Sequence, residues 1–170
     1  NLPISKGNAI DIGTGAGFPG MVLAIMNPEI QMTLMDSVGK KTKFLEMIKE
    51  KLELPNVEVV NGRSEDYIEG RREMYDLGLC RGVNRLNVIL EYVTPFIKVN
   101  GIFFPQKLEY IDEVEEAENA LKTLNCQLIE VINESLPFSK DARTILKIKK
   151  ISKTDEKFPR KAGKALKKPL

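Results

Sequence analysis

The order in which short apolar runs and amphipathic segments alternate constrains the fold of this chain more than any other feature of its sequence. Strands are expected at residues 8–12, 32–35, 57–60, 77–80 and 101–104. Helices are expected between them, at residues 19–26 and 40–52, near Glu65, and around 86–93. Repeated strand–helix–strand units build a mostly parallel sheet with helices on both faces. Because ligands of such sheets bind beyond the carboxyl ends of the strands, we expect a site in the loops that follow them.

The last third of the chain departs from that alternation. Apolar residues at helical spacing predict one amphipathic helix over 111–124. Two more strands, at 128–132 and 144–148, follow without a convincing helix between them, so we expect them to pair antiparallel at one edge. The expected fold is α/β and Rossmann-like, with a mostly parallel seven-stranded sheet and an antiparallel edge.

Composition narrows the chemistry. The 170 residues are 42% apolar and contain no histidine, which excludes catalytic triads with a His base and most zinc and iron sites. We therefore expect no metal. No apolar run approaches the length of about 20 residues that spans a membrane, and no export signal opens the chain. A cytoplasmic protein with two reduced thiols, Cys80 and Cys126, is expected.

The glycine-rich run DIGTGAGFPG, residues 11–20, follows the first strand. Gly13, Gly15 and Gly17 allow the backbone to turn sharply and approach a ligand closely, and the next helix points its amides at the same place. A G-x-G-x-x-G pattern starting at Gly15 would by itself suggest a dinucleotide. An acid two residues before the first glycine, Asp11, instead favours a loop organised to face a cationic donor such as S-adenosylmethionine.

Two further loops carry polar residues suited to a nucleoside. Asp36, followed by Ser37, closes the second strand, where a carboxylate accepts hydrogen bonds from ribose hydroxyls. NAD and S-adenosylmethionine both contain such a ribose, so Asp36 does not choose between them. After the third strand, Ser64 and Glu65 can present polar groups to an adenine ring.

The charge is concentrated at the end of the chain. Residues 150–170 hold eight Lys or Arg and two acidic residues, a net charge of +6, whereas the rest carries −4. This basic tail is either a solvated terminus or an arm that reaches a polyanion. On the second interpretation, removing residues 155–170 would weaken RNA binding and spare cofactor binding.

Several segments together resemble the bacterial glucose-inhibited division protein B (GidB) family. They are DIGTGAGFPG (11–20), LMDSVGKKTKFL (34–45), GRSED (62–66), CRG (80–82), the Lys107 loop and FPRKAGKALKKPL (158–170). The resemblance implies a class I methyltransferase fold and an enzyme that uses S-adenosylmethionine to methylate N7 of a guanine in the helix 18 loop of 16S ribosomal RNA. It also implies that residues 1–150 form the methyltransferase domain, without the family's N-terminal helical segment, and that the tail 151–170 belongs to the same domain.

The loops and the resemblance together predict the site residues. Cofactor contacts are expected at Asp11, Gly13, Gly15, Gly17, Phe18, Asp36, Ser37, Ser64, Glu65 and Arg81. Arg81 and Lys107 are expected to position the substrate, because N7 carries no proton and the displacement needs no general base. RNA contacts are expected at Arg63, Lys107, Arg143, Arg160 and Lys167, with Phe104 or Phe158 as possible stacking surfaces.

Other functions stay open on the sequence. The expected partner is 16S ribosomal RNA within the small subunit, bound by a monomer. One alternative is an NAD-linked oxidoreductase, although no His or Tyr-x-x-x-Lys proton donor stands where hydride transfer needs one. The other is a non-catalytic RNA-binding or ribosome-assembly module that has kept the fold.

Overall fold

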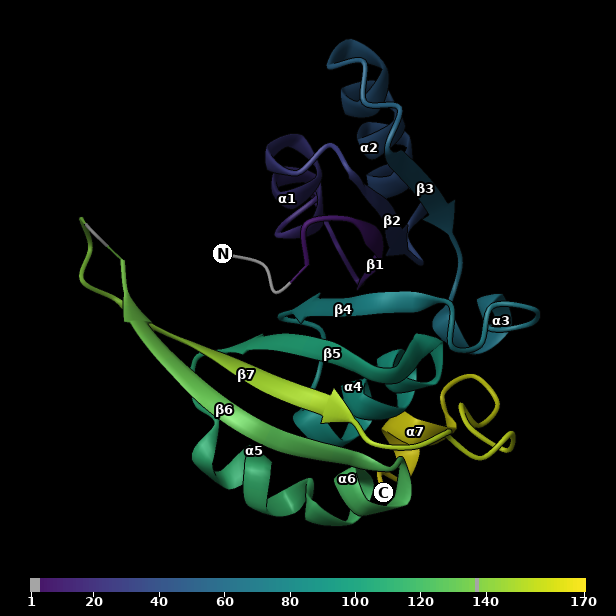
Figure 1. The fold of residues 1–170 in the computed structure, drawn as a ribbon, viewed down its shortest axis with the longest axis vertical. Helices are drawn as coiled ribbons and strands as arrows, with labels where there is room; N and C mark the ends of the chain where they lie inside the picture. Colours follow the sequence, from purple (N-terminus) through teal and green to yellow (C-terminus); the bar gives the residue numbers. More distant parts are fainter. Residues whose placement is uncertain (1–3, 137) are drawn as a thin grey trace.

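The computed structural model describes residues 4–136 and 138–170, and these form a seven-stranded sheet in the order β3-β2-β1-β4-β5-β7-β6 (Figure 1). The strands are β1 (Gly7–Ile12), β2 (Ile30–Asp36), β3 (Val57–Asn61), β4 (Tyr75–Arg81), β5 (Ile97–Lys107), β6 (Cys126–Ser135) and β7 (Ala142–Lys150). β1 to β5 pair in parallel, whereas β7 lies antiparallel between β5 and β6. The predicted α/β fold with an antiparallel edge is confirmed.

Helices follow the strands in the predicted places. They are α1 (Gly20–Met26), α2 (Gly39–Lys51), α3 (Ser64–Tyr67), α4 (Leu86–Val93), the 3-10 turn η1 (Thr94–Phe96), α5 (Ile111–Glu116), α6 (Glu118–Thr123) and α7 (Lys164–Lys167). None of the helices in the described ranges is both long and apolar enough to cross a membrane.

Alternate residues of the central strands enter two separate cores. Ala9 and Leu34 pack with residues of α1 and α2, whereas their neighbours Ile10 and Met35 pack with residues of α4 and α6. Because successive side chains of a strand point to opposite faces, helices cover both faces of the sheet. The carboxyl ends of β1 to β4 therefore meet at one edge, where the loops are free to form a site.

Two helices differ from the sequence prediction. The segment 111–124 is divided into α5 and α6 at Ala117, whose N–H is shared between the carbonyls of Glu113 and Val114. The apolar residues at helical spacing in the segment 40–52 are only partly buried, because Leu45 reaches the core while Phe44 and Leu52 are exposed. Periodicity identified both segments but not the local break or the depth of packing.

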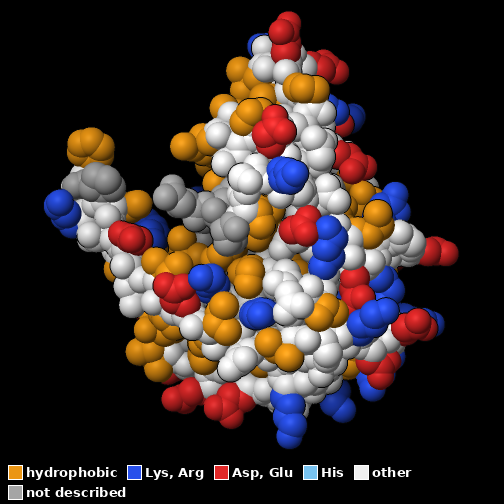
Figure 2. Space-filling model, viewed as in Figure 1, with side chains coloured by type: hydrophobic (Ala, Val, Ile, Leu, Met, Phe, Trp, Pro, Cys, Tyr) orange, Lys and Arg blue, Asp and Glu red, His pale blue; other side chains and the backbone are white. Residues whose placement is uncertain are grey.

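The C-terminal tail, residues 151–170, folds back on the body rather than extending from it. Figure 1 shows it beside α3 and α4. Phe158 and Ala165 are buried, and Phe158 packs in the same core as α4 and α6. Figure 2 shows basic and acidic side chains interspersed over this face, with Lys and Arg frequent on the side where Figure 1 places α3 and the tail. The tail is therefore basic on its surface and anchored by apolar side chains.

Candidate cofactor-binding site

A cavity of about 420 Å³ lies at the carboxyl ends of the central strands. Its volume is within the range of roughly 300–1,000 Å³ that is usual for small-molecule sites. Six of its lining residues were expected at a cofactor or RNA site from the sequence: Gly13, Asp36, Ser37, Arg63, Ser64 and Glu65. These residues follow β1, β2 and β3, so the topology brings together three loops that are far apart in the chain.

The glycine loop after β1 forms one side of this cavity. Gly13, Gly15 and Gly17 have φ values of +73°, +63° and +95°, a backbone conformation that L side chains rarely adopt. A Cβ atom on Gly13 would also collide with the Val83 side chain, which comes from the loop after β4. The loop is fixed to the sheet because the N–H groups of Gly13 and Thr14 donate to the Met35 carbonyl, at 2.8 and 3.0 Å. Glycine at position 13 thus lets two loops approach each other at the cavity wall.

Asp11 organises the glycine loop from below. Its Oδ2 accepts hydrogen bonds from the Thr14 hydroxyl at 2.7 Å and the Gly20 N–H at 2.9 Å, which joins β1, the loop and α1. Burial raises the pKa of this carboxyl, and the two hydrogen bonds and nearby Arg81 oppose the shift. Its Oδ1 is buried without a hydrogen-bond partner. Asp11 lies behind the loop rather than in the cavity lining, as an organising residue would.

Asp36 presents a carboxylate to the cavity. Oδ2 accepts from the Gly15 N–H at 3.0 Å and from the Lys41 ammonium at 3.4 Å, and Oδ1 accepts from the Val38 N–H at 2.9 Å. A carboxylate has about four acceptor positions, so one position on Oδ1 stays available. That position can accept a hydrogen bond from a hydroxyl group of a ligand.

The third wall joins α3 to the C-terminal tail. The Ser64 hydroxyl donates to Glu65 Oε2 at 3.2 Å, and Glu65 Oε1 accepts from the Gly163 N–H at 3.2 Å. Gly163 and Leu166 both line the cavity. Sequence reasoning missed these two tail residues, together with Val38, Lys41, Gly82, Val83 and Tyr92. The tail had been expected to serve RNA alone.

The remaining expected cofactor residues lie around the cavity rather than in its lining. The Arg81 guanidinium lies over the Phe18 ring, 5.5 Å from its centroid. Both side chains are exposed, which leaves them accessible to a ligand at the mouth. Gly15 and Gly17 shape the loop, and Gly15 reaches the cavity only through its bond to Asp36.

Lys107 is held inside the protein. Its side chain is 9% exposed, and its ammonium donates to the Asn84 carbonyl and pairs with Glu113, both at 2.6 Å. Glu113 also accepts the N–H of Leu86 at 2.7 Å. Lys107 therefore joins the loop after β5 to the loop after β4. Two of the three ammonium donors are thus satisfied inside the protein, which gives Lys107 a positioning role.

The other cations expected to bind RNA have different surroundings. Arg63, which lines the cavity, and Lys167, on α7, are both exposed. Arg143 precedes Thr144, which pairs with Lys107, so it lies just past the carboxyl end of β5 at the edge that holds the cavity. Arg160 instead has its guanidinium on the buried carboxylate of Glu91, with contacts of 2.6 to 3.0 Å. Arg160 is thus occupied by an internal partner rather than exposed for phosphate.

The structure corrects the expectation that Phe104 or Phe158 provides a stacking surface. Phe158 is only 4% exposed and belongs to the core. Phe104 is partly buried and packs against the core on the other face of the sheet. The burial of Phe158 leaves no free ring face for a base, and the packing of Phe104 against the core agrees with a structural role. In the ranges that the structure describes, no group of three or more His, Cys, Asp or Glu side chains could hold a metal ion.

Comparison with known sequences gives a family match. Residues 2–146 match the GidB family, described as rRNA small subunit methyltransferase G. A protein of Fusobacterium nucleatum named Ribosomal RNA small subunit methyltransferase G is 59% identical over 161 residues, which are 95% of this chain and 69% of the relative. One of the same name from Alkaliphilus oremlandii is 46% identical over 168 residues, covering 97% of this chain and 70% of the relative.

Solved structures agree with the fold. A 16S rRNA (adenine(1408)-N(1))-methyltransferase mutant from Catenulisporales acidiphilia superposes with a TM-score of 0.70 at 15% identity, over 88% of this chain and 87% of that one. M. jannaschii TYW2 in complex with AdoMet superposes with a TM-score of 0.69 at 15% identity, over 86% of this chain and 70% of that one. At such low identity these likenesses show the Rossmann-like fold alone.

Proposed function

The chain belongs to the GidB family, rRNA small subunit methyltransferase G, and from that premise we propose that the cavity over the glycine loop is where it holds S-adenosylmethionine and methylates 16S ribosomal RNA. The family's activity makes the chain an rRNA methyltransferase that acts on guanine N7. We place the target guanine in the helix 18 loop. The observation that carries the site is the convergence of Gly13, Asp36 and Ser64 on one cavity.

The residues around the cavity fit this cofactor. The free acceptor position of Asp36 suits a ribose hydroxyl, and Ser64 and Glu65 offer polar groups beside it. The close approach of Gly13 to Val83 leaves the backbone, rather than a side chain, facing the ligand. The buried Asp11 carboxyl lies behind the same loop and holds the backbone in place through Thr14 and Gly20.

The chemistry demands positioning more than proton transfer. S-adenosylmethionine supplies a methyl group on a sulfonium, and guanine N7 has an in-plane lone pair with no proton to remove. The protein therefore needs to orient the two reactants and exclude water. Burial raises the pKa of the Cys80 thiol, next to Arg81, so this side chain stays neutral and offers no competing nucleophile. Lys107 contributes by fixing the loop after β4 against the loop after β5.

Cations at the cavity and along the same edge of the sheet suit an RNA ligand. N7 lies on the major-groove edge of guanine, which side chains cannot reach in a paired A-form helix, so the target base must be unpaired. Arg63 and Arg81 flank the cavity, Lys167 lies on α7, and Arg143 lies on the β6–β7 hairpin at the same edge of the sheet. We assign RNA contacts to these four residues and not to Arg160. We also propose that the chain acts as a monomer in the cytoplasm and uses no metal.

Transfer of a labelled methyl group to undermethylated small subunits tests this function. The wild-type chain should methylate one guanine at N7, as read by mass mapping of the RNA, and Asp36→Ala should weaken binding of S-adenosylhomocysteine by about 1–3 kcal/mol. Asp112→Ala, an exposed carboxylate outside this cavity, is the control and should bind normally. Unchanged affinity of Asp36→Ala would place the ribose elsewhere.

The same measurements separate the alternatives. A calorimetric response to NAD with none to S-adenosylhomocysteine would support the oxidoreductase, which family membership disfavours. Binding of small subunits with normal cofactor affinity but no transfer would support a non-catalytic assembly module.

A further inference from the structure

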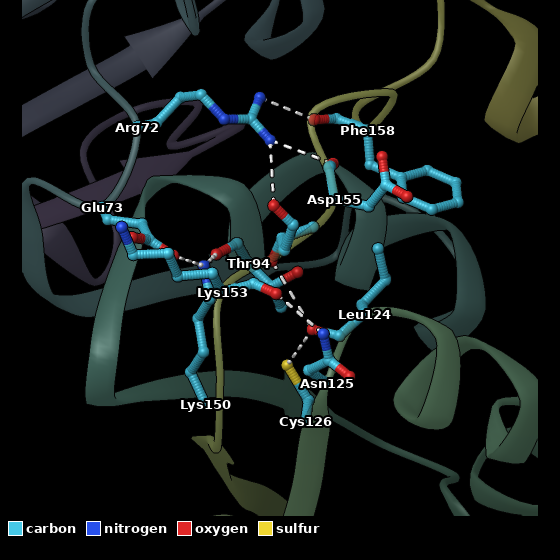
Figure 3. A network of polar contacts seen from close by, with 11 residues as sticks. Arg72, Glu73, Thr94, Leu124, Asn125, Cys126, Lys150, Lys153, Asp155 and Phe158 are labelled. Atoms are coloured by element: carbon cyan, nitrogen blue, oxygen red, sulfur yellow. Dashed lines mark hydrogen bonds and ion pairs between the residues drawn. The ribbon is translucent and has the colours of Figure 1, made fainter.

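The start of the C-terminal tail is fixed to the body by a network of polar contacts (Figure 3). Arg72, in the loop before β4, donates to the carbonyls of Phe158 at 2.7 Å, Asp155 at 3.1 Å and Thr154 at 3.5 Å. The fully buried Lys150 donates to the Thr94 carbonyl at 3.0 Å and pairs with Glu73 at 3.2 Å. The path of the chain after β7 is therefore set by side chains that lie far away in the sequence.

A second anchor holds the tail just before α7. Glu91, on α4, is fully buried, and its two carboxylate oxygens accept from Arg160 through the backbone N–H at 2.7 Å, Nε at 2.9 and 3.0 Å, and Nη2 at 2.6 Å. These contacts raise the pKa of the Arg160 guanidinium above its usual value. A bidentate, charge-assisted pair in a buried place fixes direction as well as distance. The residues after Arg160 therefore leave the body at a defined position.

From that position the chain reaches the cofactor cavity. Gly163 donates its N–H to Glu65, Ala165 is buried against the body, and Leu166 lines the cavity while its side chain remains 55% exposed. Tyr92, which follows Glu91 on α4, lines the same cavity. A large apolar side chain that stays exposed at the rim of a cavity offers apolar surface to a bound ligand.

We propose that Leu166 is a cofactor-contacting residue, which forms with Tyr92 an apolar wall for the nucleoside half of the cofactor, and that the Glu91–Arg160 pair is the device that positions it. This inference rests on the proposed function of the cavity. A purine ring has apolar faces and polar edges, so Ser64 and Glu65 serve the edges while Leu166 covers a face. The tail is then part of the cofactor site, and its removal cannot spare cofactor binding.

Calorimetric titration with S-adenosylhomocysteine, without RNA, tests the contact. Leu166→Ala should weaken binding by about 5- to 20-fold, because it removes apolar area that the ligand would bury. Leu52→Ala is the matched control, since Leu52 is 51% exposed at the end of α2 and outside this cavity. It should bind within twofold of the wild type. If Leu166→Ala also binds within twofold, the wall is disproved.

A double-mutant cycle tests the positioning role of Glu91. Glu91→Gln keeps the size and an acceptor but removes the charge, so it should loosen α7 and weaken binding by several-fold. If Glu91 acts through Leu166, the affinity of the double variant should lie within about twofold of that of Leu166→Ala. The losses from the two substitutions would then not be additive. Full additivity of the two losses would show that Glu91 supports folding only and would overturn its positioning role.

Failure of this inference can be told from failure of the proposed function. If the wild-type chain binds S-adenosylhomocysteine, Asp36→Ala weakens binding and Leu166→Ala does not, the cavity holds the cofactor and the tail does not contact it. If the wild-type chain does not bind this ligand at all, the proposed function of the cavity fails first.

Discussion

The glycine loop and the C-terminal tail border the same cavity but are held there by different means. The loop is fixed by Asp11, whose partners Thr14 and Gly20 lie three and nine residues away, and by bonds of its N–H groups to Met35 and Asp36 at the end of β2. The tail is fixed by side chains that are 69 to 98 residues distant, at Glu91 and Glu65. The first wall is therefore encoded within one segment, residues 11–36, whereas the second depends on the completed fold. Substitutions should accordingly affect the loop through backbone geometry and the tail through its anchors.

The largest expected effect tests whether the tail belongs to the core. Phe158→Ala should lower the free energy of unfolding by about 3–5 kcal/mol, because it leaves a cavity among buried apolar residues. Phe138→Ala is the control, since that ring is 99% exposed, and should change stability little. Urea denaturation measures both. Equal effects would mean that the tail is a solvated arm after all.

The next effect tests the second anchor. Glu91→Ala leaves the largely buried Arg160 guanidinium without its partner, which should cost about 3 kcal/mol of unfolding free energy. The pair Arg85–Glu116 is half exposed at both ends, so Glu116→Ala should cost about 1 kcal/mol or less. Urea denaturation of the two variants gives the comparison. A loss of stability in Glu91→Ala as small as that in Glu116→Ala would show that the Glu91–Arg160 pair does not anchor the tail.

A smaller effect separates two glycines of the other wall. Gly13→Ala and Gly15→Ala both place a side chain at positive φ, which should cost roughly 1–2 kcal/mol each. Only Gly13→Ala adds a collision, with Val83, whereas a Cβ on Gly15 meets nothing within 4 Å. We expect Gly13→Ala to weaken binding of S-adenosylhomocysteine about tenfold more than Gly15→Ala does. Equal losses would show that conformational freedom alone, and not close approach, requires Gly13.

The smallest effect concerns pH. Burial lowers the pKa of Lys150, so the unfolded chain binds a proton at this lysine more tightly than the folded chain does. The stability of the wild type relative to Lys150→Met should therefore rise as the pH increases from the lowered pKa toward 10.5. Denaturation curves at several alkaline pH values measure this difference. A difference that stays constant or falls with pH would contradict the sign.

The contrast between the two walls also explains what the sequence could predict. The strands, the glycine loop, Asp36 and Ser64 follow from periodicity and from residue types that stand directly after strands, so they were predicted in their places. Asp11 was expected as an organiser of the loop, and its hydrogen bonds fit that role.

The tail residues could not be found in this way. Nothing near Arg160 indicates that its partner is Glu91, and a basic segment at the end of a chain has the same composition whether it packs or extends. Leu166 reaches the cavity only because Phe158 enters the core and Glu65 accepts the Gly163 N–H. The sequence likewise predicts that Lys107 is available to the substrate. It does not give the placement of α5, from which Glu113 pairs with the Lys107 ammonium.

Hydrogen–deuterium exchange of the full chain with and without S-adenosylhomocysteine tests the central claim most directly, because it reports both walls in one measurement. We expect slower exchange on ligand addition at residues 13–17 and 62–65 and also at residues 163–168, with the β6–β7 hairpin unchanged. Slower exchange at the loops with no change at residues 163–168 would contradict a cofactor site built from both ends of the chain.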